Sequence, residues 1–337
     1  RILIAQVIPS GKLPKYSYIP ELNEKIAEMV AGLNSGQVFL VNQAQGFNWQ
    51  DYTVHDKVHP NKAGAEKMAT VWFEALKKVL GSSETVFSPE IVRYKTLEDG
   101  DSLALHIFKP RNMQAGEKRP AIVYFFGGGW KLGTPIQFYR ECAYYASKGM
   151  VAVSVDYRIG YLHHSTPFES FEDAKDAICW LRSHALDYQL DPDKIAVAGG
   201  SAGGHLAAAL GTIGSDETVP AGYRPNLSVL YYPVVDMVSR GYGFPEIKRD
   251  FEKISPIHHV SEATPSTLIL LGTKDPIVSV ETIEAYQDKL LQKGVDCELH
   301  LFEGAGHPIF LYRKPLTEEY YKVRKLTDDF LKRQGFL

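Results

Sequence analysis

The feature that most constrains the fold is the alternation of uninterrupted apolar runs with helical segments after residue 90. The runs include AIVYFF, VAVSV, IAVA, VLYYPVV and LILL, and a further strand-like segment, CELHLF, follows them. A strand that is apolar at every position is buried on both faces, and such strands occur in mostly parallel sheets with helices packed on each side. The sequence therefore predicts an α/β fold, in which ligands bind beyond the C-terminal ends of the strands.

A smaller block with its own strand and helix pattern precedes this region. RILIAQVIP and QVFLVN read as strands, and ELNEKIAEMVAGL and NKAGAEKMATVWFEALKKVL read as amphipathic helices. The polar segment GSSETVFSPE, which contains Pro89, reads as a linker. The length of 337 residues suits two domains. We therefore predict a first segment at 1–80, a linker at 81–90 and a larger α/β domain at 91–337, which opens with a hairpin around the Asp-Gly turn of LEDGDSLAL.

Composition and charge exclude several classes of protein. The net charge is −3 with no basic cluster, so a nucleic-acid partner is not expected. The longest apolar runs are about ten residues, too short to span a bilayer. Cys142, Cys179 and Cys297 are widely spaced without a CxxC pair, which argues against a metal site or a disulfide framework. We expect core or half-buried thiols, and a single disulfide stays open.

The motif GGSAG, at residues 199–203, marks Ser201 as the candidate nucleophile. It follows an apolar strand and begins an alanine-rich helix. In that context G-x-S-x-G forms a sharp, strained turn that exposes the serine, because only small neighbours allow the strand and the helix to approach so closely. The helix N-terminus also directs N–H groups toward developing negative charge.

A serine nucleophile needs a general base, and the base needs an orienting carboxylate. Asp275 follows the strand STLILLG and His307 follows CELHLF, so both come after strand ends, in the chain order Ser, Asp, His. Asp275 could instead cap a helix, with Asp236 or Asp296 as the acid. Other histidines lie in less suitable places: His258, His259, His300 and also His205, whose spacing from Ser201 favours helix packing.

The segment FGGGW, at residues 126–130, ends another predicted strand and supplies candidate oxyanion donors. Glycines there allow backbone N–H groups to point into the site without a Cβ in the way. Backbone N–H groups of this segment and the N–H of Ala202, after the nucleophile, are therefore candidate donors to the oxyanion of a tetrahedral intermediate.

Taken in order, FFGGGW, VSVDYR, GGSAGGHL, GTKD and GAGH make residues 90–337 resemble an α/β-hydrolase esterase or lipase of the acetyl-esterase and hormone-sensitive-lipase-like type. The resemblance implies an α/β-hydrolase fold, a triad of Ser201, Asp275 and His307, and no metal or organic cofactor. It also implies an oxyanion hole formed by Gly128, Gly129 and Ala202. The family usually has histidine before the glycines, where this chain has Phe126. That histidine supports the loop, so the departure concerns loop detail and leaves the reaction unchanged.

The segment DKVHPNKAG, at residues 56–64, resembles the last block of the SGNH (GDSL-type) hydrolases. Asp56 and His59 match that family's D-x-x-H, and its first block with the serine is missing. A GDSL string does occur, but its Ser102 lies in a polar hairpin turn after the D-x-x-H block. We therefore expect an orphan dyad whose serine belongs to an upstream part of the same polypeptide. The alternative is a simple helix-entry loop.

These observations predict a serine carboxylic ester hydrolase. Two ester-cleaving modules in one chain favour a carbohydrate esterase that removes acetyl or other small or aromatic acyl groups from polysaccharide, which is an analogy at the level of fold. Trp130, Tyr157 and Tyr161 could stack on sugar rings or belong to the core, and His163 and His164 could line the pocket. The alternatives are a short-chain carboxylesterase or lipase, a peptidase, and a non-catalytic binding module. The sequence does not fix the compartment, and a periplasmic or secreted bacterial protein is favoured.

Overall fold

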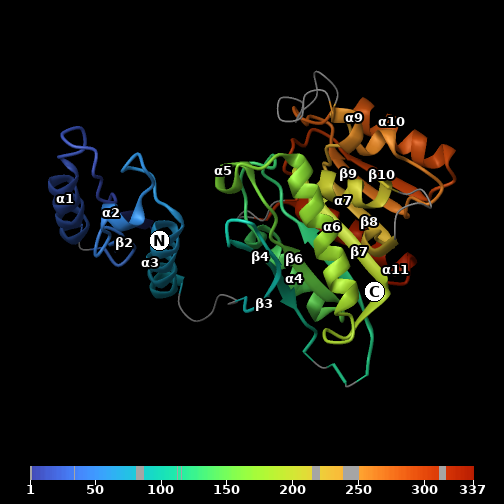
Figure 1. Ribbon diagram of the computed structural model, residues 1–337, viewed down its shortest axis with the longest axis horizontal. Helices are drawn as coiled ribbons and strands as arrows, with labels where there is room; N and C mark the ends of the chain where they lie inside the picture. The colour runs from blue at the N-terminus through green and yellow to red at the C-terminus, as the bar shows by residue number, and fades with distance from the viewer. Residues whose placement is uncertain are drawn as a thin grey trace. The chain divides into compact units, whose positions relative to one another are not determined.

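The computed structural model describes residues 2–33, 35–80, 87–111, 113–114, 116–214, 221–237, 250–310 and 316–337. The chain divides into two compact units, residues 1–86 and 87–337, and each is considered by itself (Figure 1). Within the described part of the chain, no helix is both long and apolar enough to cross a membrane.

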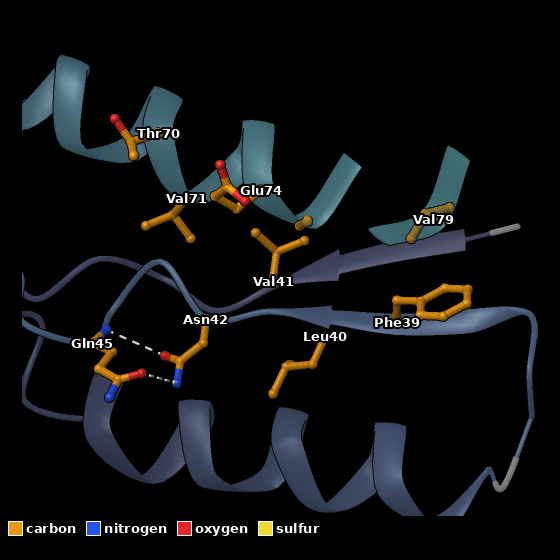
Figure 2. Close-up of a pocket in the computed structure, with 10 residues that line it drawn as sticks. Phe39, Leu40, Val41, Asn42, Gln45, Thr70, Val71, Glu74 and Val79 are labelled. Carbon is orange, nitrogen blue, oxygen red and sulfur yellow. Dashed lines mark hydrogen bonds between the residues drawn. The ribbon is translucent and has the colours of Figure 1, made fainter. Parts of the chain in front are cut away.

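The first unit is built around a two-stranded parallel sheet of β1 (Ile2–Ala5) and β2 (Val38–Val41). Its helices are α1 (Ile19–Gly32), α2 (Trp49–Tyr52) and α3 (Lys62–Leu80), and both α1 and α3 contact β2. Val41 points toward α3 and is fully buried, whereas Leu40 points to the other side of the strand (Figure 2). The gap between β2 and α3 forms a cavity of about 410 Å³.

The second unit contains an eight-stranded sheet in the order β10-β9-β8-β7-β5-β6-β4-β3. The pairs from β10 through β6 are parallel, and β4 pairs antiparallel with both β3 and β6. The mostly parallel sheet that the sequence predicts is confirmed. The strands are β3 (Glu90–Thr96), β4 (Ser102–Phe108), β5 (Arg119–Phe125), β6 (Val151–Val155), β7 (Leu190–Gly200), β8 (Leu227–Tyr231), β9 (Thr267–Gly272) and β10 (Cys297–Phe302).

Helices flank this sheet, and the green helix α6 crosses in front of the strands in Figure 1. The helices are α4 (Tyr139–Ser147), α5 (Gly160–His163), α6 (Pro167–Ser183), α7 (Ala202–Thr212), α9 (Phe251–Ile254), α10 (Val280–Gln292) and α11 (Glu318–Arg333). Among the described residues, short 3₁₀ helices lie at η1 (Pro135–Phe138), η2 (Ala221–Tyr223) and η4 (Pro256–His258). The apolar strands are buried because neighbouring elements cover them, as shown by the zero exposure of every β5 residue from Ala121 to Phe125.

The structure also shows where the GDSL string and the three cysteines lie. Ser102 begins β4 after a turn in which Gly100 has φ +84°, so the GDSL string lies in an antiparallel hairpin and not at the end of a parallel strand. All three cysteines are free. Cys142 and Cys297 are buried, but Cys179 is exposed, contrary to the expectation of a buried or half-buried thiol, because it lies on a solvent-facing position of α6.

Candidate active site

Ser201 lies in the sharp turn between β7 and α7. Its backbone has φ 56° and ψ −118°, a strained conformation for a residue with a side chain. A Cβ at Gly199 would lie 2.3 Å from the carbonyl oxygen of Gly203, and one at Gly203 would lie 2.0 Å from that of Phe125. The flanking glycines are therefore required for the strand and the helix to approach. The Ser201 N–H donates to the Tyr231 carbonyl at 3.0 Å, which ties the turn to β8.

His307 and Asp275 come to Ser201 from loops that follow neighbouring parallel strands. His307 lies beyond β10 and Asp275 beyond β9. His307 Nε2 is 2.8 Å from Ser201 Oγ, and His307 Nδ1 is 2.6 Å from Asp275 Oδ2. The Nδ1–H donates to the carboxylate, which leaves Nε2 as the acceptor for the serine hydroxyl.

The environment of Asp275 keeps its carboxylate ionised. Its side chain is fully buried. Burial raises the pKa of Asp275, but hydrogen bonds from His307 and from the N–H groups of Val278 and Ile277 outweigh burial and hold the pKa below its ordinary value. Oδ1 accepts both backbone N–H groups, at 2.8 and 3.0 Å, so Oδ2 is held toward His307. One carboxylate therefore does both things that the sequence left as alternatives: Oδ1 of Asp275 accepts backbone N–H groups, and Oδ2 pairs with His307.

The alternative acids have other partners. Asp236 faces His258, with 3.8 Å between Oδ1 and Nε2. Asp296 accepts a hydrogen bond from the Gln334 amide at 2.8 Å near the surface. Among the described residues, the carboxylate that is hydrogen-bonded to His307 is therefore that of Asp275, and not that of Asp236 or Asp296.

The alternative histidines are also placed elsewhere. His205 is fully buried, and its Nε2–H donates to the Ile254 carbonyl at 2.7 Å. Burial lowers the pKa of His205 to about 4, against a smaller opposing effect of that hydrogen bond, so the ring is neutral. His300 faces Glu298 at 3.4 Å. His205 therefore packs behind the site, as its spacing predicts.

The glycine loop that follows β5 lies against the serine turn. Gly128 and Gly129 have φ values of 142° and 62°, which favour glycine. A Cβ on Gly127 would lie 3.5 Å from Ser201 Cβ. The Gly127 N–H donates to Gln137 Oε1 at 2.6 Å, whereas no described group accepts from the N–H of Gly128 or Gly129.

Ala202 is the first residue of α7, where a helix N–H has no acceptor within its own helix. The loop and the helix start therefore offer N–H donors beside the serine.

Two of the predicted substrate-binding residues are in the core. Trp130 is 1% exposed and packs edge-on against His205, with 5.1 Å between ring centroids. Tyr157 is fully buried and donates its hydroxyl to the Phe126 carbonyl at 2.6 Å. Neither ring is open to a substrate, so the prediction of sugar stacking by these two residues is wrong and its core alternative holds.

The other aromatic and histidine candidates lie on α5. His163 is half-buried, and its Nδ1 accepts the Ile159 N–H at 3.0 Å. Tyr161 is 71% exposed. The Tyr161 N–H donates to the Lys131 carbonyl at 3.1 Å, and the Gly160 N–H donates to that of Trp130 at 2.8 Å. The helix α5 is thereby attached to the segment that follows the glycine loop.

Sequence reasoning missed Gln137 and Tyr232. Tyr232 follows β8, is almost fully buried, and has its ring centroid 4.8 Å from that of His307. Its hydroxyl would be 2.6 Å from a Cβ on Gly200, so the ring fills the space beside the serine turn. The position of Tyr232 after a strand adjacent to β7 is a signal that could have identified it. Gln137 carries no such signal.

In the first unit, Asp56 and His59 form a pair. His59 Nδ1 is 2.5 Å from Asp56 Oδ2, and the His59 side chain is 77% exposed. The hydrogen bond from the His59 side chain, with those from the backbone N–H groups of His59 and Val58, lowers the pKa of Asp56 far below its ordinary range. Within the described residues, no hydroxyl bonds to the other ring nitrogen of His59. The pair is therefore formed without a serine partner here.

Solved structures carry the decisive comparison. The native esterase 2 from the planctomycete Thermogutta terrifontis is 37% identical in sequence, with a TM-score of 0.69 over 74% of this chain and 93% of that chain. The chain belongs to the α/β-hydrolase esterases. Another structure of the same neighbour, phosphorylated by paraoxon, has a TM-score of 0.68 at 37% identity and covers 74% of this chain and 95% of that one.

Sequence comparisons agree with this assignment to the α/β-hydrolase esterases. The BD-FAE family model matches residues 105–243. Esterase LipC of Mycobacterium tuberculosis is 29% identical over 241 residues, which cover 62% of this chain and 57% of that protein. An acetylxylan esterase of Xylanibacter ruminicola is 25% identical over 227 residues, with 63% and 44% covered. The chain thus spans about half the length of the curated relatives that it matches.

Proposed function

We propose that residues 87–337 form a serine carboxylic ester hydrolase with Ser201, His307 and Asp275 as its triad. The observation that carries the proposal is the continuous hydrogen-bonded chain from Ser201 Oγ through His307 to Asp275, at 2.8 and 2.6 Å. A nucleophile within reach of a base, with the base held by a third group, is the arrangement that acyl transfer requires. Membership of the α/β-hydrolase esterases supports the same chemistry.

Each residue has a defined part in the reaction. Ser201 Oγ attacks the ester carbonyl carbon while its proton passes to His307 Nε2. The negative charge that develops on the carbonyl oxygen is stabilised by the N–H groups of Gly128, Gly129 and Ala202. His307 then returns the proton to the departing alcohol, and an acyl group remains on Ser201. A water molecule, deprotonated by His307, attacks the acyl carbon, and the acid leaves as Ser201 is reprotonated.

For the substrate, we propose acetyl or other small or aromatic acyl groups on a polysaccharide or oligosaccharide. The similarity to an acetylxylan esterase supports this class. Tyr161 supports it as well, because this residue is 71% exposed on α5, which is hydrogen-bonded to the segment after the glycine loop. An exposed aromatic ring in that position can stack on a sugar. His163, on the same short helix, stays a candidate for lining the site.

A general short-chain carboxylesterase is the second candidate. The observation that favours it is that structures of the Thermogutta terrifontis neighbour were solved with propionate and with butyrate bound. These are products of simple short-chain esters and carry no sugar.

Two measurements test the reaction and its substrate class. Turnover of p-nitrophenyl acetate before and after treatment with paraoxon tests the serine mechanism, because paraoxon phosphorylates the neighbour. The serine oxygen would bond to phosphorus as the nitrophenolate leaves. Full activity after exhaustive treatment would contradict a serine hydrolase and favour a non-catalytic module with an incidental esterase contaminant.

Acetylated and feruloylated oligosaccharides, read by mass spectrometry, separate the two substrate classes. Loss of acetyl or feruloyl groups at rates that exceed those on p-nitrophenyl esters supports the carbohydrate esterase. Turnover of the small esters alone supports the general esterase.

For residues 1–80 we propose the final part of an SGNH-type hydrolase that acts as a structural unit within this chain. The proposal is supported by the Asp56–His59 pair and by the strand and helix order that precedes it. Without a serine in reach among the described residues, the pair has no nucleophile to activate. His59→Ala is the corresponding test and should leave ester hydrolysis intact.

A further inference from the structure

The support of the glycine loop comes from a side chain ten residues downstream. Gln137 lies in η1, is half-buried, and its Oε1 accepts the Gly127 N–H at 2.6 Å. The helix η1 is itself held, because Ser154 Oγ donates to the Pro135 carbonyl at 2.7 Å from the buried strand β6. Gln137 is therefore fixed at a defined position and not simply resting on the surface.

This hydrogen bond engages the first N–H of the glycine loop and leaves the next two without an acceptor among the described residues. Gly127 is the first of three consecutive glycines, and its N–H is taken by Gln137. The N–H groups of Gly128 and Gly129 have no acceptor among the described residues. The bond thus fixes the orientation of the first peptide of the loop, to which the peptides of Gly128 and Gly129 are joined.

The contact is also close to the reacting atoms. A Cβ on Gly127 would lie 2.8 Å from the Gly200 carbonyl oxygen and 3.6 Å from Gln137 Oε1. Gly127 is thus confined between the serine turn on one side and the Gln137 side chain on the other. A small movement of Gln137 would shift the loop relative to Ser201.

The residue before the glycines does not supply this support. Phe126 is fully buried and stacks on Tyr157 at 4.0 Å between ring centroids. Its side chain has no hydrogen-bonding group, and its carbonyl accepts from the Tyr157 hydroxyl at 2.6 Å. The packing of Phe126 therefore fixes where the glycine loop starts, but it provides no hydrogen-bonding side chain to orient the N–H groups of the loop.

We propose that Gln137 is a positioning residue that aims the oxyanion donors Gly128 and Gly129. This inference rests on the proposed function of the same site. Oxyanion donors act mainly in the transition state, so their misplacement lowers kcat more than it raises KM. Removal of a complete donor costs about 10²- to 10³-fold in kcat. A displaced donor should cost less, about 10- to 100-fold.

The test compares Gln137→Met with Gln287→Met in the full chain. Methionine matches glutamine in length but does not accept the Gly127 N–H as an amide oxygen does. Gln287 is the control because it is a partly buried glutamine that bonds a backbone group, the Cys297 carbonyl, at 3.4 Å, on α10. Active sites are counted by the nitrophenolate released in one paraoxon turnover, and kcat is expressed per titrated site. A loss of folded protein would change the count and leave kcat per site unchanged.

For Gln137→Met we expect kcat per titrated site to fall about 10- to 100-fold, with KM for p-nitrophenyl acetate within about threefold. The rate constant for phosphorylation by paraoxon should fall in parallel. Gln287→Met should retain both rates. A Gln137→Met protein with kcat per site within twofold of the parent would overturn the inference.

Two further variants distinguish a folding defect, a failure of the proposed function and a failure of the role proposed for Gln137. If Gln137→Met does not fold, Gln137→Asn replaces it, because the shorter amide keeps the polarity and places its oxygen one methylene away from Gly127. The same kcat criterion applies to it. Ser201→Ala identifies the cause of a failure. Activity that survives Ser201→Ala overturns the proposed function and this inference together, whereas activity lost in Ser201→Ala and retained in Gln137→Met overturns only the role of Gln137.

Discussion

Ser201 and His307 are 106 residues apart in the sequence, and the fold brings Ser201 Oγ to 2.8 Å from His307 Nε2. The two residues lie beyond the C-terminal ends of β7 and β10, in the part of the sheet from β10 to β6 where the strands run parallel. Parallel strands end at the same edge, so loops that are distant in sequence meet there. The strain at Ser201, with φ 56°, is compatible with a turn that exposes its hydroxyl to this histidine.

Ser201→Ala should lower kcat on a short-chain aryl ester by roughly 10³-fold or more, the scale of losing a triad member. Alanine retains the Cβ, so the backbone strain and the fold should be unchanged in circular dichroism and thermal denaturation. His307→Ala should have a similar effect. The double variant should be little worse than either single one, because the triad acts as a unit. Additive losses would argue that the two residues work independently.

Asp275→Asn should also lower kcat by about 10³-fold or more, because an amide no longer favours the histidine tautomer that leaves Nε2 free to accept.

The lowered pKa of Asp275 also affects the stability of the fold. A carboxylate with a depressed folded-state pKa stabilises the fold above its ordinary pKa, and this stability is lost as the pH falls through the folded value. Urea denaturation of Asp275→Asn should therefore show a weaker decline at acid pH than the parent. An unchanged acid dependence would contradict the assigned ionisation.

Hydrolysis should survive EDTA, because the nucleophile is activated by a side-chain base and needs no metal-bound water. Activity should rise with pH along one ascending limb, because a general base acts only in its deprotonated form. The lowered pKa of Asp275 keeps its own titration away from that limb. Initial rates with and without EDTA, across a buffered pH series, check both points. Activity that is lost with EDTA and restored by a divalent cation would contradict the mechanism.

His205 should make stability fall with decreasing pH. Its pKa in the folded chain is about 4, below the ordinary 6.5, because burial disfavours the charged ring. Between these values the unfolded chain binds a proton that the folded chain does not, so the contribution is fully present above about 6.5 and is lost as the pH falls toward 4. The slope can reach about 1.4 kcal/mol per pH unit.

Urea denaturation between pH 7 and pH 4 measures this effect. His205→Gln keeps a donor for the Ile254 carbonyl and should show a smaller slope than the parent, even if it is less stable at every pH. His164→Gln, at an exposed histidine of the same unit, serves as the control and should keep the parent slope. Equal slopes for all three proteins would contradict a neutral, buried His205.

The central elements of the site could be predicted because their signals are local. A strand, G-x-S-x-G and a helix follow one another directly around Ser201, and Asp275 and His307 each follow an apolar strand. The chain order and the parallel sheet then place them at one edge. No distance between them follows from the sequence alone, and the loop geometry supplies the 2.6 and 2.8 Å separations.

Other features depend on contacts that no local pattern encodes. Trp130 and Tyr157 follow strand ends, where a side chain can turn either to the pocket or to the core, and the packing of Tyr157 on Phe126 decides for the core. Gln137 belongs to a short 3₁₀ helix and matches no sequence motif. Its proposed role is apparent only from the hydrogen bond that it accepts from the Gly127 N–H. Tertiary packing, and not residue type, assigns these roles.

Ester hydrolysis by this chain should not depend on the Asp56–His59 pair. A general base must come within about 3 Å of the proton that it takes, and no described hydroxyl bonds to the free nitrogen of His59. His59→Ala should therefore leave ester hydrolysis within about twofold of the parent. Ser102→Ala should do the same, because Ser102 begins an antiparallel strand after a hairpin turn.

The two variants are assayed beside Ser201→Ala on the same p-nitrophenyl and oligosaccharide esters. If His59→Ala abolished turnover of any ester that Ser201→Ala still cleaves, the first unit would hold a working site and the roles of the two units would be reversed. The same result with Ser102→Ala would instead identify a second nucleophile in the β3–β4 hairpin of the second unit. If His59→Ala mainly lowers thermal stability, the pair has a structural role in its loop. That role follows from the geometry, because Asp56 Oδ1 accepts the N–H groups of Val58 and His59 at 2.9 and 3.0 Å while Oδ2 holds the His59 ring. Loss of the ring would remove one of these three bonds and leave the turn at the start of α3 less constrained.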